Sequence, residues 1–291
     1  MRISIIAAML ATGLCGSGAA QTAFNTSVRD LVDEVKSGSA ASPQLPAKPA
    51  PAALPPAAQK PAQDYNALIL EVVRSMPEGG GYSIRPDAFS ALRDSIENQN
   101  GTLAVDTSAS MPSFCSAATY QVFLKVIAKL QKQGLALDNE TVDSLLVRNQ
   151  PDGEGVWGRW NANAAGIARL FHELGLGRNF SSYEEAKPGD FLKIFWTDKI
   201  GKQERGHSVI YLGSFTENGE EYIRFWSANT PGGFGVKAKE KSSGIRTVFS
   251  RLERPEALTG IGNMPLTDPY SASLLSKAST KQEMFQKVGI K

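Results

Sequence analysis

The chain has 291 residues, of which 42% are hydrophobic and 21% are charged, and its formal net charge is +2. This composition is that of a globular protein with enough apolar residues for one core. The near-neutral charge and the lack of a run of Lys and Arg argue against a nucleic-acid-binding surface, so no nucleic-acid partner is expected.

The first 20 residues have the pattern of an export signal. A basic residue is followed by an apolar run over residues 3–14, and small residues follow up to Ala20. This is the order of a signal peptide with a small-residue cleavage site, and the run is too short to span a bilayer comfortably. We therefore expect a signal peptide over residues 1–20 and an exported protein, periplasmic or secreted. The alternative is an uncleaved or lipidated anchor at Cys15.

Residues 21–63 are predicted to hold a short helix and a linker. Apolar side chains recur on one side of a possible helix over residues 26–36. Residues 40–63 are rich in Ala and Pro and have no aromatic side chain, so they cannot bury a core and are expected to be a disordered, extended spacer. The spacer could provide reach and association within a cell envelope, or it could be a featureless linker.

Residues 64–291 are predicted to form one folded domain of helices followed by strands. Apolar residues recur at helical spacing in its first part, and short apolar runs between turn residues make up the second part. Helices followed by an antiparallel meander define an α+β domain. The expected helices cover residues 65–76, 87–98, 139–148, 162–174 and 276–291, with another beginning at Cys115, and the expected strands cover residues 103–105, 191–196, 207–213, 222–227 and 244–252.

Cys115 lies at the start of one of these helices. Pro112 and Ser113 precede it as start signals, and Gly134 follows as the stop. The helix dipole favours a thiolate at this position, and free backbone N–H groups can receive a developing oxyanion. Once a signal peptide has removed Cys15, Cys115 is the single thiol of an exported protein, which is either buried and inert or kept for its chemistry. We predict that it is a nucleophile.

A nucleophilic cysteine needs a base, and the chain has two histidines. His172 lies near the end of a helix next to Glu173, where a histidine is most often a surface residue or a charge partner of the helix. His207 opens a strand after a polar loop. His207 is the predicted base, and an ordinary histidine at a strand edge is the alternative.

Three segments together resemble the NlpC/P60 superfamily of cysteine peptidases and amidases. They are Cys115-Ser116 at a helix start, the turn Lys187-Pro188-Gly189-Asp190, and the strand Gly206-His207-Ser208-Val209-Ile210-Tyr211-Leu212-Gly213. The resemblance implies a papain-like fold, in which the cysteine helix packs on an antiparallel sheet that carries the histidine. The chain departs from the family pattern at Phe114, where most members have Asp, and at Ala117, where Gly is usual.

The resemblance, which covers residues 111–250, also implies a third polar residue on the strand after His207. Asn229 can accept the imidazole N–H through its side-chain oxygen and fix the tautomer. Ser227 aligns about as well but is a poorer partner for a histidine. We predict Asn229, and the alternative is that Asn229 is a turn residue before Pro231.

Residues 151–160 are predicted to be a Gly-rich loop that carries Trp157 and Trp160. Aromatic side chains with an Arg between them suit an extended peptide or a glycan, whereas the alternative is that they anchor a long loop in the core. Trp157, Trp160 and Ser116 are the predicted substrate-binding residues. No cofactor is expected, and no metal either, because the histidines and the cysteine lack ligand spacing.

Together these features predict an exported cysteine hydrolase that cleaves an amide bond in cell-wall peptidoglycan peptides or in another peptide substrate. Two alternatives remain open: an acyltransferase or transglutaminase-like enzyme on the same fold, and a non-catalytic envelope-binding domain with a buried Cys115. Thiol reactivity separates the last of these from the enzymes, since a thiolate alkylates at mildly acidic pH and a buried thiol does not.

Overall fold

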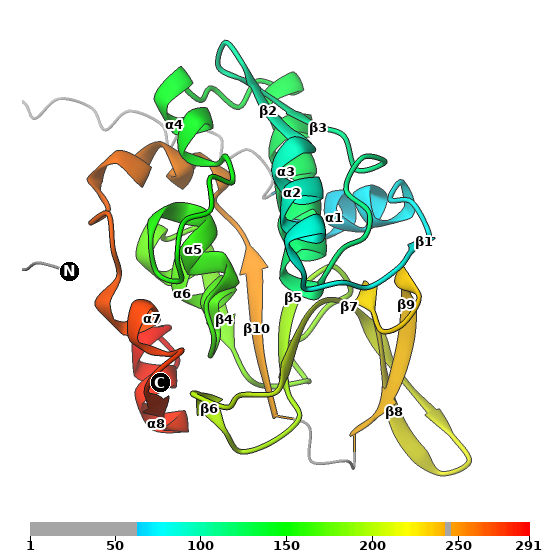
Figure 1. Ribbon diagram of the computed structural model, residues 1–291. Helices are drawn as coiled ribbons and strands as arrows, with labels where there is room; N and C mark the ends of the chain where they lie inside the picture. The colour runs from blue at the N-terminus through cyan, green and yellow to red at the C-terminus, as the bar shows by residue number, and fades with distance from the viewer. Residues whose placement is uncertain (1–62, 242–245) are drawn as a thin grey trace, which may run out of the picture. The chain divides into compact units, whose positions relative to one another are not determined.

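A seven-stranded antiparallel sheet with the strand order β1-β9-β8-β7-β5-β10-β4 forms the centre of the computed structural model, which describes residues 63–241 and 246–291 (Figure 1). Helices pack on this sheet, so the predicted α+β class is confirmed. The expected signal peptide, short helix and linker lie outside the described residues. No helix among the described residues is long and apolar enough to cross a membrane.

Most predicted strands are present, and the sheet has more strands than predicted. The Asn218-Gly219 pair forms the tight turn of a hairpin, with positive φ at both residues, as this dipeptide favours. β1, β4 and β9 were not predicted. β1 and β4 are too short to show an alternation of apolar and polar residues, whereas Phe234, Val236 and Ala238 of β9 do alternate with polar residues, a strand signal that was missed. The strands are β1 (Gly79–Gly80), β4 (Gly177–Phe180), β5 (Phe191–Phe195), β7 (Gly206–Glu217), β8 (Glu220–Asn229), β9 (Gly233–Glu240) and β10 (Arg246–Leu252).

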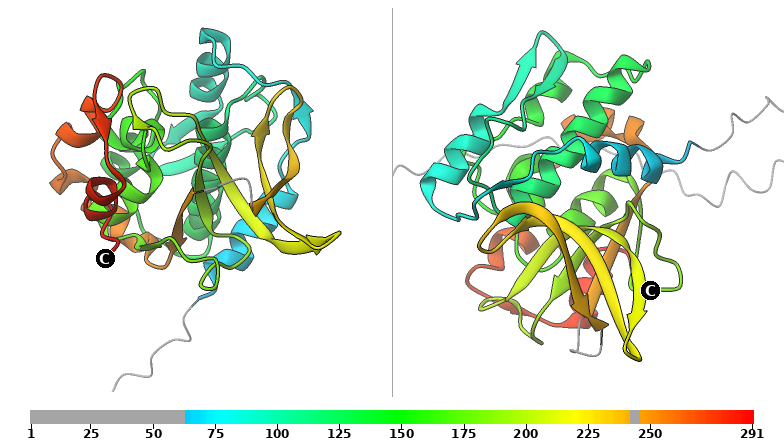
Figure 2. Two further views of the ribbon diagram at one scale, coloured as in Figure 1. Left: turned by 90° about the horizontal axis from the view of Figure 1, so that it is seen from below. Right: turned by 90° about the vertical axis from the view of Figure 1, so that its right-hand side faces the viewer.

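The central helix is α3 (Cys115–Lys132), which begins at the cysteine as predicted and packs across β7 and β8. The right-hand view of Figure 2 shows α3 above the sheet. Side chains alternate along β7, so Ile210 faces α3, whereas Val209 and Tyr211 join a second cluster. α1 (Tyr65–Arg74) packs beside α3 and agrees with the prediction.

The predicted helix over residues 87–98 is too long. α2 (Pro86–Asp94) ends earlier, and β2 (Ile96–Gln99) pairs with β3 (Thr102–Val105) in a hairpin. Its two-residue turn is Asn100-Gly101, again with positive φ at both residues. This dipeptide is a hairpin signal that the helical pattern concealed.

The region predicted as a Gly-rich loop contains a helix, so that prediction is wrong. α5 (Gly155–Asn161) turns Val156, Trp157 and Trp160 toward the core. Burial of these large side chains outweighs the poor helix propensity of the glycines. α6 (Gly166–Leu174) begins four residues later than expected and ends at Gly175, which is left-handed.

The C-terminal segment contains several short elements in place of the expected helix over residues 276–291. The buried Arg159 donates to the carbonyls of Pro265 and Leu266, while Arg169 pairs with Asp268, so two arginines fasten the segment to α5 and α6. The elements of this C-terminal region are η2 (Pro255–Asn263), α7 (Pro269–Ser273), β11 (Ala278–Ser279) and α8 (Lys281–Lys287), and β11 pairs with β6 (Ile200–Gly201). The remaining helix, α4 (Asn139–Ser144), is capped by Asp138 and ends before the predicted end at residue 148.

Asp190 joins three parts of the fold. It is fully buried and accepts two hydrogen bonds from Arg251 of β10, at 2.8 and 2.6 Å. It also accepts one from the Asn66 side chain of α1, at 2.8 Å. The carboxylate is thus paired and hydrogen-bonded, as a buried charge must be, and it ties α1 to the sheet.

Candidate active site

Cys115 occupies an uncapped helix start. The preceding residue, Phe114, is extended and buried against the Phe89 ring, with ring centroids 4.6 Å apart, and no side chain caps α3. The first backbone N–H groups of a helix have no partner within it. Cys115 as a residue is partly exposed, and its N–H is one of these first groups of α3.

His207 is the residue that approaches the sulfur, as predicted. Its ring is hydrogen-bonded to the Cys115 side chain, and its Nε2 atom lies 3.0 Å from Asn229 Oδ1. β7 and β8 pair Ile210 with Trp226, and three residues further along each strand His207 comes opposite Asn229. The register of β7 and β8 beyond the bulge between Tyr211 and Gly213 therefore determines this contact.

Asn229 has one possible orientation. Its Nδ2 group donates to the carbonyls of Ser227, at 2.9 Å, and Gly235, at 2.8 Å, which leaves Oδ1 to accept the Nε2–H of His207. This tautomer leaves Nδ1 as the ring atom that faces Cys115. Ser227, the other predicted candidate, is buried and donates to the Ser208 carbonyl at 2.7 Å, so it does not contact the histidine.

Several groups act on the Cys115 thiol in opposite directions. Burial raises its pKa, but the hydrogen bond and charge of His207, the backbone N–H of Ser208 and the charge of Lys193 lower it, and the resulting pKa is about 7. Stabilisation of the thiolate thus exceeds the desolvation cost. A large fraction of Cys115 is therefore ionised near neutral pH.

Lys193 is a cation near the Cys115 thiol that was not predicted from the sequence, and an ion pair with Glu204 holds it in place. Its Nζ lies 2.7 Å from Glu204 Oε1, and both side chains are largely buried. The other Glu204 oxygen accepts from the backbone N–H groups of Ala164 and Gly201. Lys193 pairs across the sheet with Ser208, whose N–H reaches the sulfur, and the charge of Lys193 also lowers the pKa of the Cys115 thiol.

Tyr82 is a further residue that the sequence analysis missed. Its hydroxyl is hydrogen-bonded to Cys115, and burial, together with the neighbouring thiol, raises the pKa of Tyr82 to about 12. The phenol therefore stays protonated and can donate. Its backbone N–H donates to the Pro231 carbonyl, and Tyr82 forms a parallel bridge with Ser113, two residues before the cysteine.

The run Gly79-Gly80-Gly81 makes this placement possible. All three glycines have positive φ, and a Cβ on Gly80 would come within 2.1 Å of the Met111 sulfur. Residues with side chains rarely adopt this backbone or fit this approach. Consecutive glycines are a sequence signal for such a close approach of two chain segments.

A groove of about 590 Å³ opens beside His207. The Trp196 ring forms one side of it, 37% exposed and with its centroid 6.3 Å from that of His207. Two lysines line it, and no carboxylate does. The lining residues are Tyr82, Trp196, Gly206, His207, Phe225, Asn229, Thr230, Lys237, Ala238 and Lys239.

The predicted substrate contacts of three residues are contradicted. Trp157 and Trp160 are each 1% exposed and pack with Tyr120 in the core, so the alternative of core anchoring is the correct one. The Ser116 hydroxyl is nearly buried and donates to Asn161 Oδ1 at 2.7 Å, which keeps it out of the groove. The aromatic wall comes instead from Trp196 and Phe225.

His172 is exposed at the end of α6, and it is not among the groups that shift the pKa of the Cys115 thiol. It lies beside Gly289, where a Cβ would come within 2.5 Å of its Nδ1 atom. Its neighbour Glu173 does not serve it as a charge partner, since that carboxylate pairs with Arg159 and Arg169.

Among residues 63–241 and 246–291, no group of three or more His, Cys, Asp and Glu side chains could hold a metal ion. Comparison of the chain with protein-family models, with curated proteins and with solved structures finds no match. The structure itself defines a mixed α+β protein with an antiparallel sheet. In it, His207 is hydrogen-bonded to Cys115 on one side and to Asn229 on the other.

Proposed function

We propose that the protein is a cysteine peptidase or amidase with a papain-like catalytic arrangement. The observation that carries this proposal is the hydrogen-bonded sequence from Cys115 through His207 to Asn229 at an uncapped helix start. Nucleophile, base and orienting residue in this order are the arrangement by which cysteine hydrolases activate a thiol. A buried, inert cysteine would have no need of the histidine.

The chemistry follows from these contacts. The Cys115 proton passes to Nδ1 of His207, and the thiolate attacks the carbonyl carbon of an amide. The resulting oxyanion accepts hydrogen bonds from the Cys115 backbone N–H and from the Tyr82 hydroxyl. His207 then protonates the leaving amine, a thioester remains on Cys115, and a water molecule that gives its proton to His207 releases the acid.

Tyr82 supplies one oxyanion donor in this scheme. Tyr82→Phe is expected to lower kcat by roughly 10²-fold, because one positioned donor is lost, while KM changes little. Steady-state kinetics on a cleaved peptide measure both constants. Tyr222→Phe, which removes a hydroxyl from a ring stacked on Phe215 in the β7–β8 hairpin, is the matched control. Unchanged kcat for Tyr82→Phe would exclude an oxyanion role.

The groove favours substrates with anionic groups. Lys237 and Lys239 alternate with Ala238 along β9 and share one face, and the lining contains no carboxylate to offset them. The Lys237 Nζ donates to the Thr230 carbonyl at 2.6 Å, which holds it at the rim. Acidic peptides of a bacterial cell wall fit this charge, in line with the resemblance to NlpC/P60 enzymes and with export of the chain.

Lys239→Met is expected to raise KM for a peptide with free carboxylates by roughly two- to fivefold, the range of an exposed ion pair. The KM for the same peptide with its carboxylates amidated should stay unchanged. Lys202→Met, on an exposed turn outside the groove, is the control. Equal effects on the two peptides would show that Lys239 does not recognise charge.

The direct test of the proposed function is incubation of the protein with purified peptidoglycan peptides, followed by mass analysis of the products. Addition of one water and loss of an intact peptide fragment identify amide hydrolysis. Products of amine exchange in the presence of an added amine would instead indicate an acyltransferase. The absence of any turnover with peptides of either charge would overturn the proposal.

A further inference from the structure

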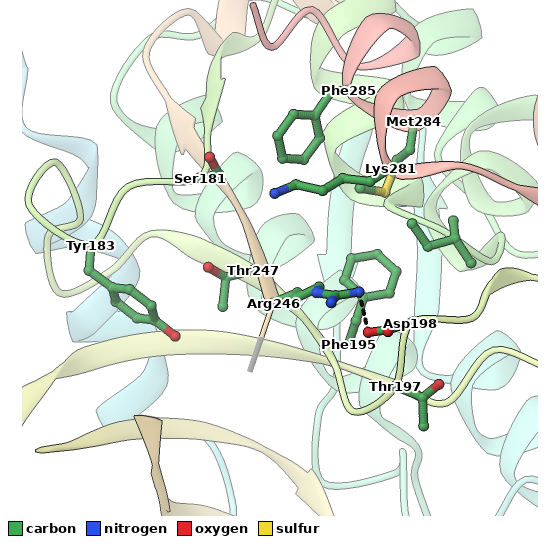
Figure 3. A pocket seen from close by; sticks show the side chains of 11 residues that line it. Ser181, Tyr183, Phe195, Thr197, Asp198, Arg246, Thr247, Lys281, Met284 and Phe285 are labelled. Carbon is green, nitrogen blue, oxygen red and sulfur yellow. Dashed lines mark ion pairs between the residues drawn. The ribbon is translucent and has the colours of Figure 1, made fainter. Parts of the chain in front are cut away.

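A second cavity, of about 200 Å³, lies at the far end of β5 and β10 (Figure 3). The end of β4, the loop after β5, the start of β10 and the helix α8 enclose it. The residues that line it are Ser181, Tyr183, Phe195, Thr197, Asp198, Ile200, Arg246, Thr247, Lys281, Met284 and Phe285.

This cavity is distinct from the active-site groove. Phe195 and Thr197 line the cavity, whereas Trp196 between them lines the groove beside His207. Successive side chains of an extended chain point to opposite sides, so the end of β5 separates the two spaces. No lining residue is shared between them.

The floor of the cavity is apolar and preformed. Phe195, Ile200 and Met284 are buried members of one hydrophobic cluster, and Phe285 packs against it. Aromatic rings and a methionine side chain offer flat, polarisable surfaces to an apolar group. This floor therefore suits an aromatic ring or a branched aliphatic group.

The rim carries one uncompensated positive charge. Arg246 forms an ion pair with Asp198, so these two charges cancel. No described carboxylate pairs with Lys281, whose Nζ lies 5.0 Å from the centroid of the Phe285 ring, and Figure 3 shows it reaching across the cavity toward Ser181. Hydroxyl groups of Thr197 and Thr247 add polar contacts at the rim. A single cation beside an apolar floor matches a monoanion with an apolar body.

We propose that this cavity binds an organic carboxylate that carries an aromatic or branched aliphatic group. The apolar group lies on Phe195 and Met284, and the carboxylate meets Lys281. A phosphate dianion fits less well, because the second cation of the rim is already paired with Asp198. The same chemistry occurs in a small free acid and in the carboxyl-terminal residue of a peptide.

Binding is measured by calorimetry on the whole chain with three probes: 3-phenylpropionate, its neutral amide, and the acetylated tripeptide Ala-Ala-Phe. Both carboxylates are expected to bind saturably, and the amide is expected to bind roughly three- to fivefold more weakly than phenylpropionate. Tighter binding of the peptide assigns the site to peptide ends, and tighter binding of phenylpropionate assigns it to small acids.

Lys281→Met is expected to remove this preference for the acid over the amide. Lys287→Met is the matched control, since it removes a lysine of the same helix whose Nζ lies over the Tyr270 ring, outside the cavity. If none of the three probes bound saturably to the unchanged protein, the proposal would be overturned. Equal affinities of the unchanged protein for the acid and the amide would overturn it as well. An effect of Lys287→Met as large as that of Lys281→Met would do the same.

Discussion

Cys115→Ser is expected to lower turnover of a cleaved peptide by roughly 10⁴-fold or more. A serine hydroxyl is far less acidic than a thiol, so His207 and Lys193 cannot produce the nucleophile that they stabilise as a thiolate. The fold should tolerate the change, because Cys115 is partly exposed and differs from serine by one atom, and the free energy of unfolding should stay within about 1 kcal/mol.

The measurement pairs kinetics with denaturant unfolding of the same preparation. Ser116→Ala, at the next position of the same helix turn, serves as the control and should retain turnover, since its hydroxyl contacts Asn161 rather than the groove. Full activity of Cys115→Ser would remove the cysteine from the mechanism. A large loss of stability would instead make the result a folding effect.

His207→Ala is expected to raise the pKa of the Cys115 thiol from about 7 toward or beyond the ordinary value of roughly 8.5. The sign follows from the opposing influences on the thiol: burial raises the pKa, and removal of His207 takes away the strongest influence that lowers it. The thiolate fraction at about pH 6.5 should therefore fall, and iodoacetamide labelling there should slow by roughly tenfold or more.

His172→Ala is the matched control, since it removes the other histidine of the chain from an exposed helix end. Labelling rates are measured from about pH 5 to pH 10, with the labelled peptide identified by mass so that Cys115 is distinguished from Cys15. A shift caused by His172→Ala and not by His207→Ala would reverse the assignment of the base. Turnover should disappear only in His207→Ala.

The positions of Cys115, His207 and Asn229 could be predicted because each depends on a local signal. A helix start and a strand start are visible in short stretches of sequence, and the Asn218-Gly219 turn indicates which two strands pair. The turn alone would place Thr230 opposite His207, and the bulge between Tyr211 and Gly213 shifts the register by one residue, so that Asn229 takes this position. Asn229 was the predicted partner, but the sequence pattern could not exclude Ser227, because residues two apart on β8 point to the same face and differ only in their position along the strand. The pairing of β7 with β8 brings Asn229, and not Ser227, to the His207 ring.

Tertiary packing determines the positions of Tyr82, Lys193 and the two Trp residues, and it leaves little trace in the sequence. Tyr82 reaches the cysteine through a bridge to Ser113 that spans thirty-one positions of chain. Trp157 and Trp160 were expected at a surface because glycines surround them, but the energy of burying two indoles determines their place. At these positions the free energy gained by packing outweighs the low intrinsic helix propensity of the glycines.

The hydrogen bonds of Asp190 connect the segment before the cysteine to the sheet. The resemblance to NlpC/P60 enzymes begins at residue 111, yet Asn66 and Tyr82 precede that point, and the first is bound to the Asp190–Arg251 pair of the sheet. A chain shortened to the recognisable stretch would lose a partner of a buried carboxylate and the phenol beside the thiol. The segment before the cysteine is thus tied to the sheet through α1, and a shortened chain used to test the proposed activity should include α1.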